Sequence, residues 1–183
     1  MKTKHYSASF LLSALLLATM WHQATLAQET GSTTNAHIGI YDSRAVAIAF
    51  AGSAPFNQWL TALKTEHAKA KAAGDQKRVA ELEAEGAARQ HLMHMQGFST
   101  APVTNILNQI QDQLPAIKQK AGVTVLVSKW DQDALAKYKN AAQVDVTMAL
   151  VDAFNPNERQ RKNAIAVLEH KPIPLEQAEQ IKD

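Results

Sequence analysis

The sequence contains no cysteine. This absence excludes disulfide bonds, metal sites built on thiolates, a cysteine nucleophile and a lipid anchor attached to an N-terminal cysteine. Stability must therefore come from packing within the chain or from association between chains.

The motifs of common catalytic sites are also missing. The chain has no Gly-x-Ser-x-Gly motif, no phosphate-binding loop and no dinucleotide-binding glycine pattern, and Gly52-Ser53 fits a turn between helices. Glu81, Glu83 and Glu85 alternate along one expected helix, so their carboxylates point to different sides and cannot form an acid–base pair. The sequence thus argues against a hydrolase and against a nucleotide-dependent enzyme.

Neither sign of charge is in excess once the N-terminus is set aside. The net charge is +2, from 19 Lys and Arg against 17 Asp and Glu, and Lys2 and Lys4 account for the difference. Binding to nucleic acid or to a strongly anionic membrane needs a basic surface. We therefore expect no nucleic-acid partner.

The first 27 residues have the pattern of a cleavable signal peptide. Lys2 and Lys4 give a basic start, residues 9–21 form a short apolar core, and Thr25 and Ala27 supply small residues at a cleavage site. A buried helix is the alternative, but it does not explain why these three features come in this order. No later apolar run reaches the length of about 18 residues that a membrane span needs. We predict export from the cytoplasm and no stable membrane insertion.

A long helical hairpin is the main element expected in the exported part. After a disordered leader over residues 28–36 and a short β-type run, the apolar spacing of Phe56, Trp59 and Leu63 predicts a helix. Gly74 suits a helix end and Asp75 suits the cap of the next helix, so the chain turns back there. The hairpin helices cover about residues 56–96, and the thin apolar stripe of the second one leaves much of the pair in water.

The remaining segments predict an α+β fold. A helix over residues 103–121, bent at Pro115, leads back to a strand over residues 123–127 that is apolar enough to be buried on both faces. A short strand and a helix ending near Phe154 follow, and residues 155–183 form a helical extension. Such an apolar strand is unsuited to the free edge of a monomer, which favours association through the strands.

Histidines and aromatic side chains were the remaining candidates for a ligand site. His91 and His94 are three residues apart on a helix and can reach one metal ion, but the hairpin offers no third ligand, so we predict no metal site. Trp59, Phe98 and Trp130 can form a ligand platform, although aromatic residues at the ends of elements more often belong to a core.

Four segments together resemble one known family. They are residues 38–43 (IGIYDS), the hairpin turn at 71–75 (KAAGD), the strand region 121–127 (AGVTVLV), and Tyr138 followed seven residues later by 145–147 (DVT). In this order they resemble the Skp/OmpH family of periplasmic chaperones for outer-membrane proteins, over roughly residues 37–154.

The resemblance implies a homotrimer in which strands of the three subunits build a small β-barrel body and the hairpins form arms around an unfolded client. It implies no enzymatic activity and no ATP or other cofactor. The trimer body would include Ile38, Ile40, Val123, Val125, Leu126 and Val127. Client-binding candidates on the arms are Trp59, Leu63, Leu82, Met95 and Phe98.

Three features depart from the family pattern. The second arm helix would span only about 31 Å, the exported part is neutral where the family is basic, and residues 155–183 have no counterpart. An alternative is therefore an envelope protein that uses the same fold structurally, for assembly or for one fixed partner. An enzyme or metal protein is a more distant alternative.

Overall fold

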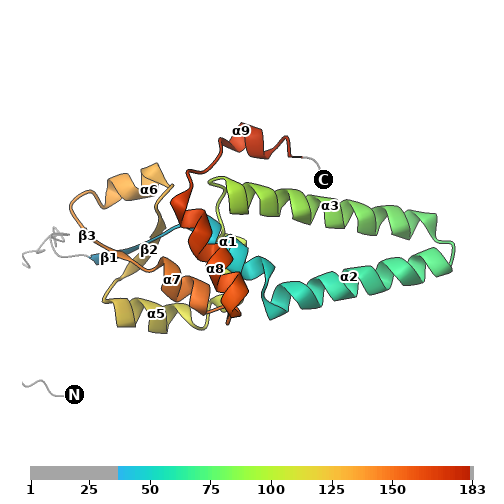
Figure 1. Ribbon diagram of the computed structural model, residues 1–183, viewed down its shortest axis with the longest axis horizontal. Coiled ribbons are helices and arrows are strands. Elements are labelled where there is room, and N and C mark those ends of the chain that lie inside the picture. The colour runs from blue at the N-terminus through green and yellow to red at the C-terminus, as the bar shows by residue number, and fades with distance from the viewer. Residues whose placement is uncertain (1–36, 182–183) are drawn as a thin grey trace, which may run out of the picture. The chain divides into compact units, whose positions relative to one another are not determined.

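The computed structural model describes residues 37–181, which fold into three strands and a larger set of helices (Figure 1). The predicted signal peptide and leader lie outside these residues. The strands are β1 (His37–Tyr41), β2 (Val125–Ser128) and β3 (Ala142–Asp145). The helices are α1 (Ser43–Ala51), α2 (Ala54–Ala72), α3 (Gln76–Phe98), α4 (Thr104–Leu107), α5 (Leu114–Ala121), α6 (Gln132–Lys137), α7 (Thr147–Asp152), α8 (Glu158–Ala166) and α9 (Leu175–Ala178), with 3-10 turns η1 (Asn108–Ile110) and η2 (Val167–Glu169).

The three strands form one parallel sheet with the order β2-β1-β3. Ile38 lies opposite Val125 in β2, and His37 lies opposite Ala142 in β3. Gly39, in the central strand, leaves no room for a side chain, because an added Cβ would lie 2.9 Å from the Cδ2 atom of Leu126. The parallel pairing follows from the helices between the strands, which return the chain to the same end of the sheet.

The prediction of an α+β fold with a small β-barrel body and a long antiparallel hairpin arm is wrong. The sheet is open, and helices make up 65% of the described residues. A barrel needs its outermost strands to pair with each other, but β2 and β3 are four-residue strands on opposite sides of β1. One helix of the expected arm is joined to the main fold, because α3 packs against α1 and α9 as well as against α2 (Figure 1).

Helix α1 forms the centre of the core. Its sequence, SRAVAIAFA, is apolar on nearly all sides, a pattern typical of a helix that is covered all round. Val46 and Phe50 are buried within it and pack with Ile106, Leu150 and other side chains from α4, α7 and α8. The apolar groups that hold the molecule together are therefore mainly helical.

Local sequence chemistry sets the limits of α2 and α3. Ser53 caps α2 by accepting a hydrogen bond from the Phe56 N–H, and Asp75 caps α3 by accepting one from the Arg78 N–H. Gly74 lies between them at a φ of 70°, a backbone conformation that favours glycine. Leu82 and Ala70 are buried where the two helices meet.

One local prediction differs from the structure. The helix expected over residues 103–121 is divided into α4, η1 and α5, because Pro115 lacks an N–H and lies in the first turn of a new helix instead of bending an existing one. Before these helices, Asp42 caps α1, since its carboxylate accepts the hydrogen bond from the Arg44 N–H.

Of the residues predicted as an extension, 155–183, the described ones, 155–181, pack on the rest of the fold. Helix α8 lies on α1, where Ala164 is fully buried, and the Gln160 side chain donates a hydrogen bond to the carbonyl of Gly52 at 2.8 Å. Further along, the Ile173 N–H donates to the carbonyl of Phe98 at 3.0 Å. In the part of the chain that the structure describes, no helix combines the length and hydrophobicity required to span a bilayer.

Candidate functional site

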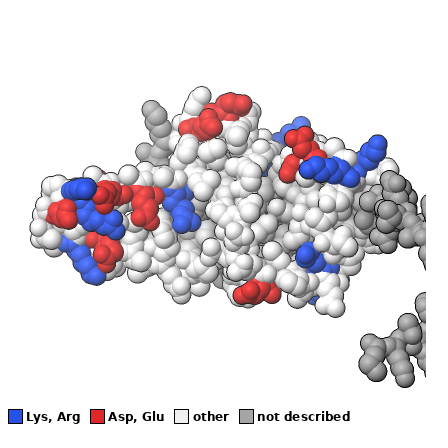
Figure 2. Space-filling view, turned by 180° about the vertical axis from the view of Figure 1, so that it is seen from behind, with Lys and Arg blue, Asp and Glu red and all other residues white. Residues whose placement is uncertain are grey.

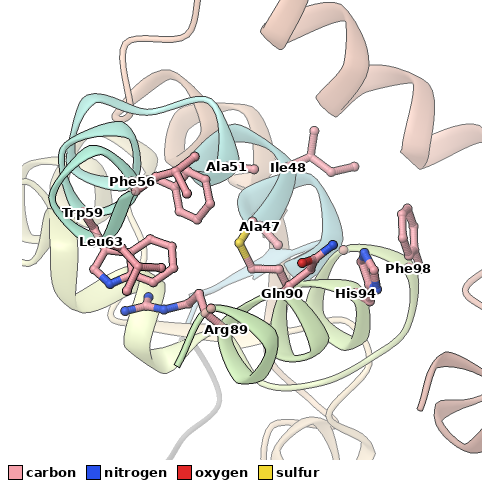
Figure 3. A pocket seen from close by; sticks show the side chains of 14 residues that line it. Ala47, Ile48, Ala51, Phe56, Trp59, Leu63, Arg89, Gln90, His94 and Phe98 are labelled. Carbon is pink, nitrogen blue, oxygen red and sulfur yellow. The ribbon is translucent and has the colours of Figure 1, made fainter. Parts of the chain in front are cut away.

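An open apolar groove lies between α1, α2 and α3, and we refer to it as the helix groove (Figure 3). Its volume is about 390 Å³, within the range of about 300 to 1,000 Å³ that is usual for ligand pockets. Helix α1 contributes Ala47, Ile48 and Ala51 to the groove. Most of the other lining residues are apolar side chains of α2 and α3, including Phe56, Trp59, Leu60, Leu63, Met93 and Phe98.

Aromatic rings form one end of the groove. Phe56 packs at 5.5 Å from Trp59 and at 5.6 Å from the core residue Phe50, so the rings continue from the core to the groove. The Trp59 indole N–H donates a hydrogen bond to Glu85 at 3.1 Å, and the guanidinium of Arg89 lies over the indole at 4.6 Å from its centroid. These contacts hold the indole in a fixed orientation.

The other end of the groove is formed by the last turn of α3. His94 and Phe98 lie there with their rings 5.5 Å apart. Phe98 is 47% exposed, the largest exposure among the exposed large hydrophobic residues of the described chain. Gly97 adds no side chain, which leaves the space between Phe98 and Ile48 open.

The helix groove brings together three of the five predicted client-binding residues: Trp59, Leu63 and Phe98. Leu82 is only 3% exposed and packs between α2 and α3, and Met95 is half-buried outside the groove lining. The sequence analysis missed the contribution of α1 and the position of Arg89. The spacing of Glu85 and Arg89, one helical turn apart on the face toward Trp59, was a signal that could have identified the latter.

The histidines do not come together. Of the pair considered for metal binding, His94 lines the helix groove and His91 is exposed, while His67 lies 3.1 Å from Glu83 across the helix pair. Among residues 37–181, no three His, Asp or Glu side chains are arranged to hold a metal ion. The expectation that the protein uses no metal stays a prediction.

Apart from the helix groove, a polar cluster lies at the carboxyl ends of the parallel strands. This is the edge where open α/β sheets commonly bind ligands. Asp42, which follows β1, accepts bonds from Arg44 at 2.8 Å, from Lys129 at 2.6 Å and from the indole of Trp130 at 3.1 Å. Its own N–H donates to the hydroxyl of Thr147, which follows β3. Arg44 and Lys129 also lie over the Trp130 ring, at 5.1 and 4.7 Å from the centroid.

Asp42 and Arg44 form the buried centre of this strand-end cluster, while Lys129 and Trp130 are partly exposed. Asp42 is 0% exposed and Arg44 is 1% exposed, and the hydrogen bonds of the cluster are made within the chain. Burial alone would raise the pKa of Asp42, but the hydrogen bonds from Arg44, Lys129 and Trp130 outweigh it and lower the pKa. The cluster therefore joins the ends of the strands to α1 and α7.

The residues predicted for a trimer body pair within a single chain. Ile38 and Ile40 of β1 lie opposite Val125 and Val127 of β2. Ile38, Val123 and Val127 are buried, while Ile40, Val125 and Leu126 are half-buried. One sheet of one chain therefore covers part of the apolar surface that the sequence analysis assigned to a subunit contact.

Comparison with known proteins gives no match to a protein-family model, to a curated protein or to a solved structure. Function is therefore argued from the helix groove and from the sequence patterns alone.

Proposed function

We propose that the protein is a periplasmic chaperone of the holdase type, which binds apolar segments of unfolded outer-membrane or other envelope proteins and needs no ATP. The helix groove is the observation that carries this proposal. It is an open apolar surface built from three helices, and Phe98, the most exposed large apolar side chain among residues 37–181, lies at its mouth.

The dimensions of the groove favour a chain segment as its occupant. A volume of about 390 Å³ admits one or two large side chains, which an extended or unfolded chain can present one after another. Phe, Trp, Leu and Met side chains line it, and such surfaces give contact area without strict hydrogen-bond geometry. Weak, adaptable contact of this kind suits a binder of many sequences.

Export is supported by the sequence pattern of the first 27 residues, and the Skp/OmpH resemblance points to the same class of client. The absence of a phosphate-binding loop from the sequence is consistent with a binder that does not hydrolyse ATP.

The test is suppression of aggregation. An outer-membrane porin unfolded in urea is diluted into buffer with and without the purified protein, and turbidity is followed. We expect the protein to delay aggregation, and Phe98→Ala to weaken the effect several-fold because it removes the exposed ring at the groove mouth.

Ile165→Ala is the matched control, since Ile165 is 38% exposed on α8 and does not line the groove. This variant should protect the porin as well as the wild type does. Equal loss of protection in both variants would mean that general surface hydrophobicity, and not the helix groove, carries the effect. If the wild type fails to delay porin aggregation, the alternative of a protein with one fixed partner becomes the better hypothesis.

A further inference from the structure

Arg89 differs in its environment from the other charged residues of α2 and α3. Lys69 pairs with Glu66 at 2.8 Å and Arg78 pairs with Glu81 at 3.2 Å, and Figure 2 shows the two signs of charge interspersed over the far end of the helix pair. Arg89 forms none of the ion pairs found within residues 37–181, and its recorded contact is with the ring of Trp59.

The position of Arg89 sets it apart from Lys64 and Lys71, which also form no ion pair among the described residues but do not line the helix groove. It is the only Lys, Arg, Asp or Glu among the residues that line the helix groove, and it is partly buried (Figure 3). A guanidinium that lies over an aromatic ring can still use the N–H donors at its edge, and these donors match the two oxygens of a carboxylate. Glu85 does not satisfy it, because no ion pair joins the two and Glu85 instead accepts the Trp59 indole N–H.

We propose that the helix groove selects apolar segments of client proteins that carry a carboxylate beside a large aromatic or aliphatic side chain, with Arg89 as the residue that determines this preference. The inference rests on the proposed function and deepens it. The apolar side chain enters the groove between Trp59 and Phe98, and the neighbouring carboxylate receives the N–H donors of Arg89 at the rim. The apolar lining alone does not distinguish one apolar segment from another. The attraction between Arg89 and a carboxylate adds this specificity.

The test compares three labelled peptides that differ at one position beside a central Phe: Asp, Asn or Lys. Binding to the full-length wild type is measured by fluorescence anisotropy. We expect the Asp peptide to bind about tenfold more tightly than the Asn peptide, because one charge-assisted hydrogen bond changes affinity by about this factor. The Lys peptide should bind most weakly, since its charge has the same sign as that of Arg89. The difference should shrink as salt is raised.

Two substitutions at Arg89 test whether this residue causes the preference for a carboxylate. Arg89→Gln should bind all three peptides about as the wild type binds the Asn peptide, and Arg89→Lys should keep part of the preference. Arg78→Gln is the matched control, because it removes the same charge at an exposed position outside the groove. Thermal melting of each variant checks that it is folded.

The outcomes separate the two proposals. Equal binding of the Asp and Asn peptides by the wild type overturns the preference for a carboxylate and leaves the chaperone function standing. Equal loss of preference in Arg78→Gln and Arg89→Gln shows an effect of net charge only and overturns the role of Arg89. Failure to bind any peptide, together with failure to protect the porin, overturns both proposals. Binding of decanoate without binding of peptides would identify a lipid ligand instead of a protein client.

Discussion

Three long-range polar contacts of the fold converge on Asp42 and link it to Lys129, Trp130 and Thr147. It receives hydrogen bonds from groups that follow β2, donates one to Thr147 at the start of α7, and caps α1. A buried carboxylate is costly unless its partners are complete. Here two cations and an indole N–H supply them, which explains why its pKa is lowered despite full burial.

The first prediction at this scale concerns Asp42→Asn. The substitution leaves the buried guanidinium of Arg44 without a counter-charge and removes the partner of the partly exposed Lys129, so it should lower the free energy of unfolding by about 3 kcal/mol at pH 7. Because the pKa of Asp42 is lower in the folded state, its contribution is complete above the unfolded value near 4 and is lost as the pH falls through the folded value. The stability gap between wild type and variant should therefore narrow at pH 3.

Urea unfolding at pH 7 and pH 3 measures this gap. Asp152→Asn is the control, since Asp152 pairs with Arg161 at the surface, where an ion pair contributes less than about 1 kcal/mol. A gap of the same size at both pH values would show that Asp42 does not titrate as stated.

Among the elements, α3 combines two tasks. Its N-terminal half pairs with α2, and its C-terminal end packs on α1 and α9. The helix groove lies along α3 between the part that contacts α2 and the part that contacts α1. Gly86 lies at this place, and a Cβ there would lie at an ordinary contact distance of 3.4 Å from the Cδ2 atom of Leu63. The position therefore tolerates a side chain that points toward the groove.

A pair of substitutions at Gly86 separates stability from binding. Gly86→Ala should raise the free energy of unfolding by about 0.5 to 1 kcal/mol, because alanine restricts the unfolded chain more than glycine does. Gly86→Leu should leave the fold intact but fill the groove and remove most of the protection of the porin.

Thermal melting and the turbidity assay give the two readouts. Ala84→Leu is the matched control, since Ala84 is exposed on the same helix and does not line the groove. Full protection of the porin by Gly86→Leu would show that the client binds elsewhere.

Sequence reasoning succeeded at this scale where a single residue type determines the local backbone. Gly74 and Asp75 were predicted to make the turn between two helices, and the structure has the positive φ of Gly74 and the Asp75 cap there. It was less successful for residues 103–121, because apolar spacing continues unchanged through η1 and does not reveal a break. The helix groove could not be predicted either, since periodicity identifies an apolar face but not the part of that face that another element leaves uncovered.

At the level of the whole molecule, residues 155–181 are part of the packed fold and not an appendage. The sequence analysis treated them as an extension because they lie outside the family pattern, and the buried Ala164 and Ala178 were not evident, since alanine is common on exposed helix faces as well. The fold class was mispredicted for a related reason. A run of apolar residues indicates a buried strand, but it does not tell whether its partner is in the same chain.

A truncated chain tests the role of this segment. Ending the chain after Pro156 removes α8, η2 and α9 and uncovers one side of α1. The loss of Val167 and Leu168 packing and of the Gln160 hydrogen bond should lower the free energy of unfolding by about 3 kcal/mol or more. For a chain of this size the melting temperature should fall by about 10 °C.

Circular dichroism melting measures the change, with a chain ending at Gln180 as the control. That chain keeps α8 and α9 and should melt close to the wild type. Equal melting temperatures for the chain ending at Pro156 and the wild type would contradict a structural role for residues 157–181.

The order of the strands also determines when the chain can fold. The contact between Thr124 and His37, beside β1 and β2, joins residues 87 positions apart, and the bond between Asp42 and Thr147 spans 105 positions. The central strand β1 is thus synthesised before both of the strands that pair with it. Closing such long loops costs entropy before any stabilising contact forms, and this slows folding. During synthesis most of the chain must emerge before the sheet can start to form. The sheet can therefore be completed only after β3, at residues 142–145, has been synthesised.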